Sequence, residues 1–185
     1  MWLGTKRYVF NGHVDDLYAL TLLVTQDITE LVQFDDLLIS KVKMVLVELL
    51  TNSLKHSGQS QTFIETALWT DKIILTKKDT GEPFSVEVEG ARLKWPLTTI
   101  AAGASFTIYG DATATLKATL TDACALHFFM EEAQIADADI DIINNLWEHF
   151  GLMIITRACH RFQYAYDASS GTNEFAATFL TNTDK

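Results

Sequence analysis

The chain has 185 residues, of which 48% are hydrophobic, 11% aromatic and 21% charged, a composition that excludes disordered, fibrous and disulfide-rich classes. Fourteen Lys and Arg against 24 Asp and Glu give a formal net charge of -10, so nucleic acid is not an expected partner. The apolar runs are shorter than the roughly 20 residues that span a bilayer, and no secretion signal is recognised. We therefore expect no membrane partner, a cytoplasmic location, and one domain over residues 1–185.

The first half of the chain predicts two helices followed by a pair of strands. Residues 14–29 place Leu17, Leu20, Val24 and Ile28 at three- and four-residue intervals, which indicates an amphipathic helix. We expect this helix to pack inward, with a homodimer interface as the alternative. Residues 34–55 carry a second apolar stripe: Leu38, Val42, Val45, Leu46 and Leu49. Residues 62–70 and 72–77 are rich in β-branched and aromatic side chains, which predicts antiparallel strands.

The second half of the chain predicts short strands, then helices, then a closing hairpin. Residues 105–109, 112–120 and 125–130 have the character of short strands. Residues 140–159 show helical spacing with a glycine break near Gly151. Residues 161–167 and 174–181 alternate on either side of a Ser-Ser-Gly turn. The predicted fold is therefore α+β, a layer of helices on a mixed or antiparallel sheet.

A polar cluster lies on the second predicted helix. Glu48 and Asn52 are four residues apart, and Lys55 and His56 follow one turn later on roughly the same face. A carboxylate can orient a water molecule, an amide oxygen can ligate Mg²⁺, and a cation can contact a phosphate. A solvated helix face is the alternative interpretation.

Two further features are compatible with a ligand site. Asp79 ends a predicted strand, where its carboxylate can accept a hydrogen bond from an exocyclic amine while Gly81 lets a ligand approach the backbone. Gly151 and Leu152 can open a helix whose N-terminal amides bind phosphate. An ordinary strand-ending turn and a simple helix break are the respective alternatives.

In this order, four segments resemble the GHKL ATPase superfamily, which joins gyrase, heat-shock chaperone, histidine kinase and mismatch-repair ATP-binding domains. Residues 48–57 resemble its N box, and residues 79–84 its adenine-binding glycine box. Gly151-Leu152 and Gly171-Thr172 resemble its phosphate-binding glycine box and its Gly-Thr signature. The length and the Asp-x-Gly-x-Pro-Phe variant are most similar to the anti-sigma-factor type of serine kinase.

This resemblance implies a Bergerat-type fold that binds ATP and Mg²⁺. Glu48 would be the catalytic residue that polarises the attacking hydroxyl or water, and Asn52 would bind Mg²⁺. Lys55 and His56 would lie near the phosphate tail.

The same resemblance assigns the remaining nucleotide contacts. Asp79 would accept a hydrogen bond from the adenine amino group, with support from Thr172, and Gly81 would let the base approach. Gly151 and Leu152 would present backbone amides to the phosphates.

Departures from the family pattern keep three functions open. Only Gly151 stands where the family carries a Gly-x-Gly pair, and residues 85–147 are longer than a typical lid, which suggests an atypical insertion. The first function is a partner-switching serine/threonine kinase that binds a sigma-like factor or a small antagonist protein. The second is a non-catalytic interaction module with a degenerate nucleotide site, and the third is a detached catalytic domain of a sensor histidine kinase.

Overall fold

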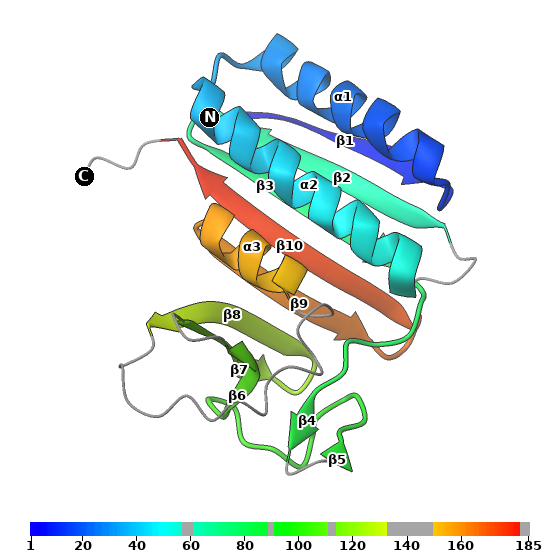
Figure 1. Ribbon diagram of the computed structural model, residues 1–185, viewed down its shortest axis with the longest axis vertical. Helices are drawn as coiled ribbons and strands as arrows, with labels where there is room; N and C mark the ends of the chain where they lie inside the picture. The colour runs from blue at the N-terminus through cyan, green and yellow to red at the C-terminus, as the bar shows by residue number, and fades with distance from the viewer. Residues whose placement is uncertain (57–60, 89–90, 111–113, 133–149, 182–185) are drawn as a thin grey trace.

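A computed structural model describes residues 1–56, 61–88, 91–110, 114–132 and 150–181, which form an antiparallel sheet with helices on one face (Figure 1). Every strand pair in the eight-stranded sheet is antiparallel, so within the described residues the sheet is antiparallel and not mixed. In spatial order the strands are β1 (Trp2–Phe10), β2 (Thr62–Trp69), β3 (Lys72–Asp79), β10 (Thr172–Leu180), β9 (Arg161–Asp167), β8 (Ala125–Glu132), β7 (Ala114–Asp122) and β6 (Ser105–Gly110).

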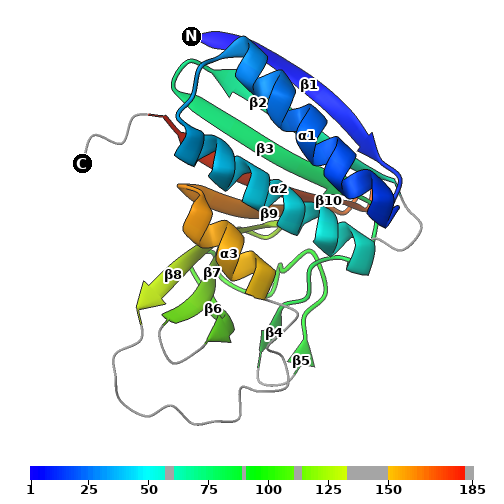
Figure 2. The ribbon, with the colours of Figure 1, turned by 45° about the horizontal axis from the view of Figure 1, so that its top comes forward.

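The helix layer runs across the sheet in the order α1 (Val14–Leu31), α2 (Asp36–His56) and α3 (Phe150–Ala158). Helix α1 contacts β1, α2 contacts β3 and β10, and α3 contacts β8 and β9 (Figure 2). The predicted apolar stripe of α2 is buried along its whole length, from Leu38 to Leu49. Each such side chain contributes roughly 1.5–3 kcal/mol on burial, so α2 is anchored firmly on the sheet.

Strict alternation on β2 and β3 decides which side chains face the helices. On β3 the residues at 73, 75, 77 and 79 are buried, and those between them are half-buried on the opposite face. The first two of these buried residues, Ile73 and Leu75, belong to the hydrophobic core. The last two, Lys77 and Asp79, are charged, so the apolar core gives way to a polar site at the end of this strand.

A small hairpin, β4 (Glu87–Val88) and β5 (Ala91–Arg92), follows β3 and forms a separate two-stranded sheet. The indole nitrogen of Trp95 donates a 2.7 Å hydrogen bond to the carbonyl of Phe84. The amide of Leu93 donates to the carbonyl of Val86 at 2.8 Å, and Val86 is fully buried. These contacts join the segments that enter and leave the hairpin.

Most predicted elements are confirmed. Both early helices, the strand pair predicted at 62–70 and 72–77, the short strands and the closing hairpin are present, although residues 112–113 lie outside the described residues. Strands β6 to β8, which belong to the predicted insertion, extend the main sheet.

Strand β1 was not predicted, because Tyr8 and Phe10 are its only buried residues and no clear alternation marks it. Residues 140–149 of the predicted late helix lie outside the described part, and Gly151 lies in the first turn of α3. In the part of the chain that the structure describes, no helix has both the length and the apolar character needed to cross a membrane.

Candidate functional site

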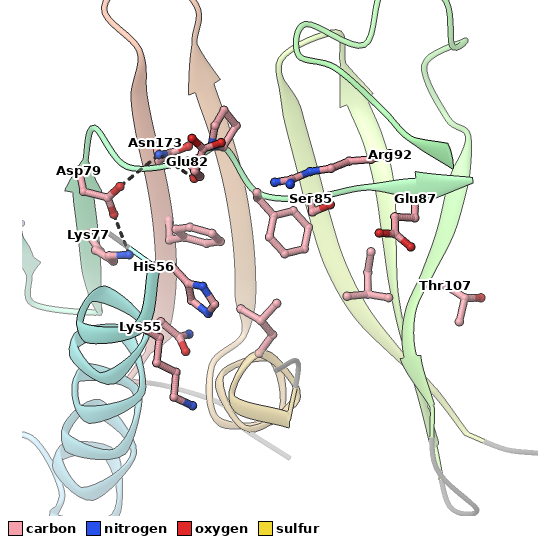
Figure 3. A pocket seen from close by; sticks show the side chains of 16 residues that line it. Lys55, His56, Lys77, Asp79, Glu82, Ser85, Glu87, Arg92, Thr107 and Asn173 are labelled. Atoms are coloured by element: carbon pink, nitrogen blue, oxygen red, sulfur yellow. Dashed lines mark hydrogen bonds and ion pairs between the residues drawn. The ribbon is translucent and has the colours of Figure 1, made fainter. Parts of the chain in front are cut away.

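A cavity of about 640 Å³ lies where α2 ends beside β3 and β10, opposite the β4–β5 hairpin. Figure 3 shows Lys55 and His56 at the end of α2, next to Lys77 and Asp79 of β3, with Arg92 on the far side. The lining therefore mixes several basic groups with the aromatic rings of Phe84 and Phe175 and three carboxylates: Asp79, Glu82 and Glu87. A cavity with this lining suits a ligand that has both a flat ring and negative charge.

Asp79 is a buried polar group of the cavity, with its side chain only 5% exposed. Its Oδ1 accepts hydrogen bonds from the amide of Gly81 at 2.9 Å and from Nδ2 of Asn173 at 3.1 Å. Its Oδ2 lies 2.7 Å from Nζ of Lys77. Burial raises the pKa of Asp79, but the charge of Lys77 and these donors outweigh burial, so the pKa is lowered overall. The carboxylate is therefore charged at neutral pH.

Lys77 is buried as deeply as its partner, with a side chain that is 4% exposed. Its Nζ lies 5.3 Å from the ring centroid of Phe175, within the range of a cation–π contact. Because Lys77 and Asp79 are two residues apart on one strand, the alternation of β3 brings both side chains to the same face. A buried ion pair of this kind loses much of its Coulomb energy to desolvation, so it is weak evidence of a stabilising role.

A hydrogen-bond chain ties the loop after β3 to β9 and β10. Nδ2 of Asn173 also donates to the carbonyl of Gly81 at 2.9 Å, and the hydroxyl of Tyr164 donates to Oδ1 of Asn173 at 2.7 Å. The same hydroxyl accepts from the amide of Phe84 at 3.0 Å. Burial raises the pKa of Tyr164, so its hydroxyl keeps the proton that this chain requires. The backbone at 81–84 is therefore fixed before any ligand arrives.

Glu48 lies at the contact between α2 and α3. A Cβ on Gly151 would come within 2.7 Å of Oε2 of Glu48 and 3.6 Å of Oδ1 of Asn52, so a larger residue at position 151 would displace the Glu48 carboxylate. Burial raises the pKa of Glu48, against the opposing charge of Lys55. A carboxyl with a raised pKa is suited to proton transfer near neutral pH.

The structure brings five of the nine predicted site residues together around the cavity: Asn52, Lys55, His56, Asp79 and Leu152. Gly81 is hydrogen-bonded within the turn beside them, and Glu48 and Gly151 contact each other just outside the lining. Thr172 is not a lining residue, and its hydroxyl accepts a 2.8 Å hydrogen bond from Ser170 in the β9–β10 turn.

Sequence reasoning missed three polar residues of the site: Lys77, Asn173 and Tyr164. Asn173, the neighbour of Thr172, is the β10 residue that supports Asp79, because these two residues are paired in register. The position of Lys77 was recoverable from the alternation of β3, since it follows Ile73 and Leu75 at two-residue intervals.

No family model matches the chain, and no curated protein matches it. Within the residues described by the structure, no group of three or more His, Cys, Asp or Glu side chains is placed to hold a metal ion.

Proposed function

We propose that the cavity binds ATP with Mg²⁺ and that the chain is a GHKL-type protein serine/threonine kinase acting in partner switching. The observation that carries this proposal is the convergence of Asn52, Lys55 and His56 on α2 with Asp79 on β3 around one cavity. These residues come from the two segments that resemble the N box and the adenine-binding glycine box. The antiparallel sheet with helices on one face is compatible with a Bergerat-type fold.

Asp79 lies at the end of the proposed site that would hold the adenine base. Its charged carboxylate can accept a hydrogen bond from an exocyclic amino group, and its own position is fixed by Gly81 and Asn173. The rings of Phe84 and Phe175 line the same cavity and offer apolar surface to a purine.

The end of the proposed site that would hold the phosphates is formed by Asn52, Lys55 and Leu152. The amide oxygen of Asn52 can ligate a divalent cation that the phosphates also hold, and Lys55 can neutralise phosphate charge. Leu152 lies in the first turn of α3, where backbone amides and the helix dipole favour an anion. Magnesium would supply charge neutralisation between the phosphates.

Glu48 is the residue proposed to act on the attacking hydroxyl, because its raised pKa suits a general base. The hydroxyl would belong to a serine or threonine of a protein partner, either a sigma-like factor or a small antagonist protein. Positioning and charge neutralisation account for most catalysis of phosphoryl transfer, so few reactive side chains are required.

Calorimetric titration with a non-hydrolysable ATP analogue, with and without Mg²⁺, tests the binding proposal. We expect magnesium-dependent binding that Asp79→Asn abolishes. Asp71→Asn is the matched control, because Asp71 is exposed at the opposite end of the β2–β3 hairpin. Absence of binding to the native chain, or equal binding by Asp79→Asn, would refute the proposed site.

A non-catalytic interaction module is the second candidate function, and the position of Glu48 favours it. The carboxylate of Glu48 packs against Gly151 and is not among the residues that line the cavity. The two candidate functions differ in phosphate transfer. If the chain is a kinase, the native chain transfers phosphate, and Glu48→Gln stops the transfer but still binds the nucleotide. A module binds nucleotide or partner with no transfer by the native chain.

A further inference from the structure

The ammonium of Lys77 has more hydrogen-bond donors than the protein uses. A lysine ammonium carries three N–H donors, and the described residues give it one acceptor, Oδ2 of Asp79. The side chain is almost fully buried and lines the cavity beside Asp79 (Figure 3). The remaining donors are therefore available to a molecule inside the cavity, and leaving a buried donor without an acceptor is costly.

The carboxylate of Asp79 has the opposite balance, because most of its acceptor capacity is already in use. Two oxygens provide about four lone-pair sites. Gly81 and Asn173 occupy Oδ1, and Lys77 occupies one site on Oδ2. About one acceptor site remains for a ligand, next to the free donors of Lys77.

This donor and acceptor pattern distinguishes between purine bases. An adenine offers an amino donor next to the ring acceptor N1, which requires one acceptor and one donor from the protein. A guanine offers the O6 acceptor next to two donors, N1–H and the 2-amino group, which require two acceptor sites. The single remaining site on Asp79 matches adenine and leaves one guanine donor unpaired.

Building on the proposed ATP site, we propose that Lys77 is a specificity-determining residue that donates to N1 of a 6-aminopurine while Asp79 accepts from the amino group. The 2.7 Å separation of Nζ and Oδ2 brings donor and acceptor close enough to address adjacent atoms on one edge of the base. The ring of Phe175, 5.3 Å from Nζ, helps to hold the ammonium in place. This role accounts for a buried charge pair at a position where an apolar residue would extend the core.

The test compares three nucleotides by calorimetry on the full chain in the presence of Mg²⁺: ATP, GTP and 1-deaza-ATP, in which a C–H group replaces N1. We expect the native chain to bind 1-deaza-ATP about tenfold or more weakly than ATP, because a hydrogen bond to a charged donor is lost. GTP should bind more weakly than ATP by at least a similar factor.

Two variants test whether Lys77 causes the difference in affinity between ATP and 1-deaza-ATP. Lys77→Met keeps the length of the side chain but removes its donors, so it should bind ATP and 1-deaza-ATP with equal affinity. Lys78→Met is the matched control, because Lys78 lies on the opposite face of the sheet, where it pairs with Glu65 and Glu174. This control should keep the discrimination of the native chain.

The outcomes separate the two proposals. Equal binding of ATP and 1-deaza-ATP by the native chain would overturn the role of Lys77 while the ATP site stands. Absence of ATP binding would overturn both. The comparison within the native chain needs no variant, so it decides the question even when Lys77→Met fails to fold.

Discussion

Replacing Asp79 with asparagine leaves the ammonium of Lys77 buried without its counter-ion, and we expect a large loss of stability. The two charged atoms lie 2.7 Å apart, with side chains 4% and 5% exposed. At an effective dielectric constant of about 20, their attraction amounts to about 6 kcal/mol, most of which desolvation offsets in the intact pair. Removal of one partner leaves the desolvation cost uncompensated, so Asp79→Asn should destabilise the fold by about 3–5 kcal/mol.

Urea denaturation of the native chain, both single variants and Lys77→Met/Asp79→Asn measures this coupling. The double variant removes both charges, so it should be more stable than Asp79→Asn alone. Unfolding free energies of Asp79→Asn and the native chain within about 1 kcal/mol of each other would refute the argument, and so would additive effects of the two substitutions.

The Asp79→Asn variant also isolates the contribution of Asp79 to the pH dependence of stability. Its pKa is lowered in the folded state, relative to about 3.9 in the unfolded chain. A carboxyl of this kind contributes stability that is fully present above pH 3.9 or so and is lost as the pH falls through the folded pKa. The stability difference between the native chain and Asp79→Asn should therefore shrink below about pH 4. A difference that stays constant from neutral pH to pH 3 would contradict this assignment.

Two further substitutions test the geometry around the cavity. Tyr164→Phe removes the hydroxyl that joins Asn173 to the amide of Phe84, so it should destabilise the fold by about 1–3 kcal/mol in urea denaturation; an unchanged midpoint would show that the chain of hydrogen bonds is unimportant. Gly151→Ala should stabilise a Glu48→Ala background by up to about 1 kcal/mol, through helix propensity, and should be less favourable in the native background, where its Cβ would lie 2.7 Å from Oε2 of Glu48. Equal effects in both backgrounds, measured by thermal or urea unfolding, would mean that Glu48 of α2 does not contact Gly151 of α3.

Periodicity predicted the elements that bury one face. Leu38 and Leu49 lie on a continuous apolar stripe of α2, and β2 and β3 alternate between buried and half-buried residues, so both patterns were readable in the chain. Strand β1 was not predicted, because it is an edge strand in which Tyr8 and Phe10 are the only buried residues. Its place in the sheet depends on pairing with β2, which local sequence does not encode.

The candidate site was predictable where its residues share one element and unpredictable where they meet across strands. Asn52, Lys55 and His56 share the last turns of α2, so their spacing alone brought them together. Asn173 reaches Asp79 from a strand 94 residues away, through a register that depends on the whole sheet. The family resemblance assigns the supporting role to the neighbouring Thr172, and a shift of one residue along a strand moves a side chain to the other face.

Lys77 was overlooked because a lysine at the end of a strand is usually exposed. The alternation of β3 nevertheless carried the signal, since Ile73 and Leu75 define a buried face that continues through Lys77 and Asp79. Charged residues that continue an apolar face must either pair within the protein or serve a ligand, because an unpaired buried charge is too costly to keep. Here each of the two charges satisfies only part of the other's hydrogen-bonding capacity. That incomplete match is the physical reason to look for a ligand at the point where the core of β3 becomes polar.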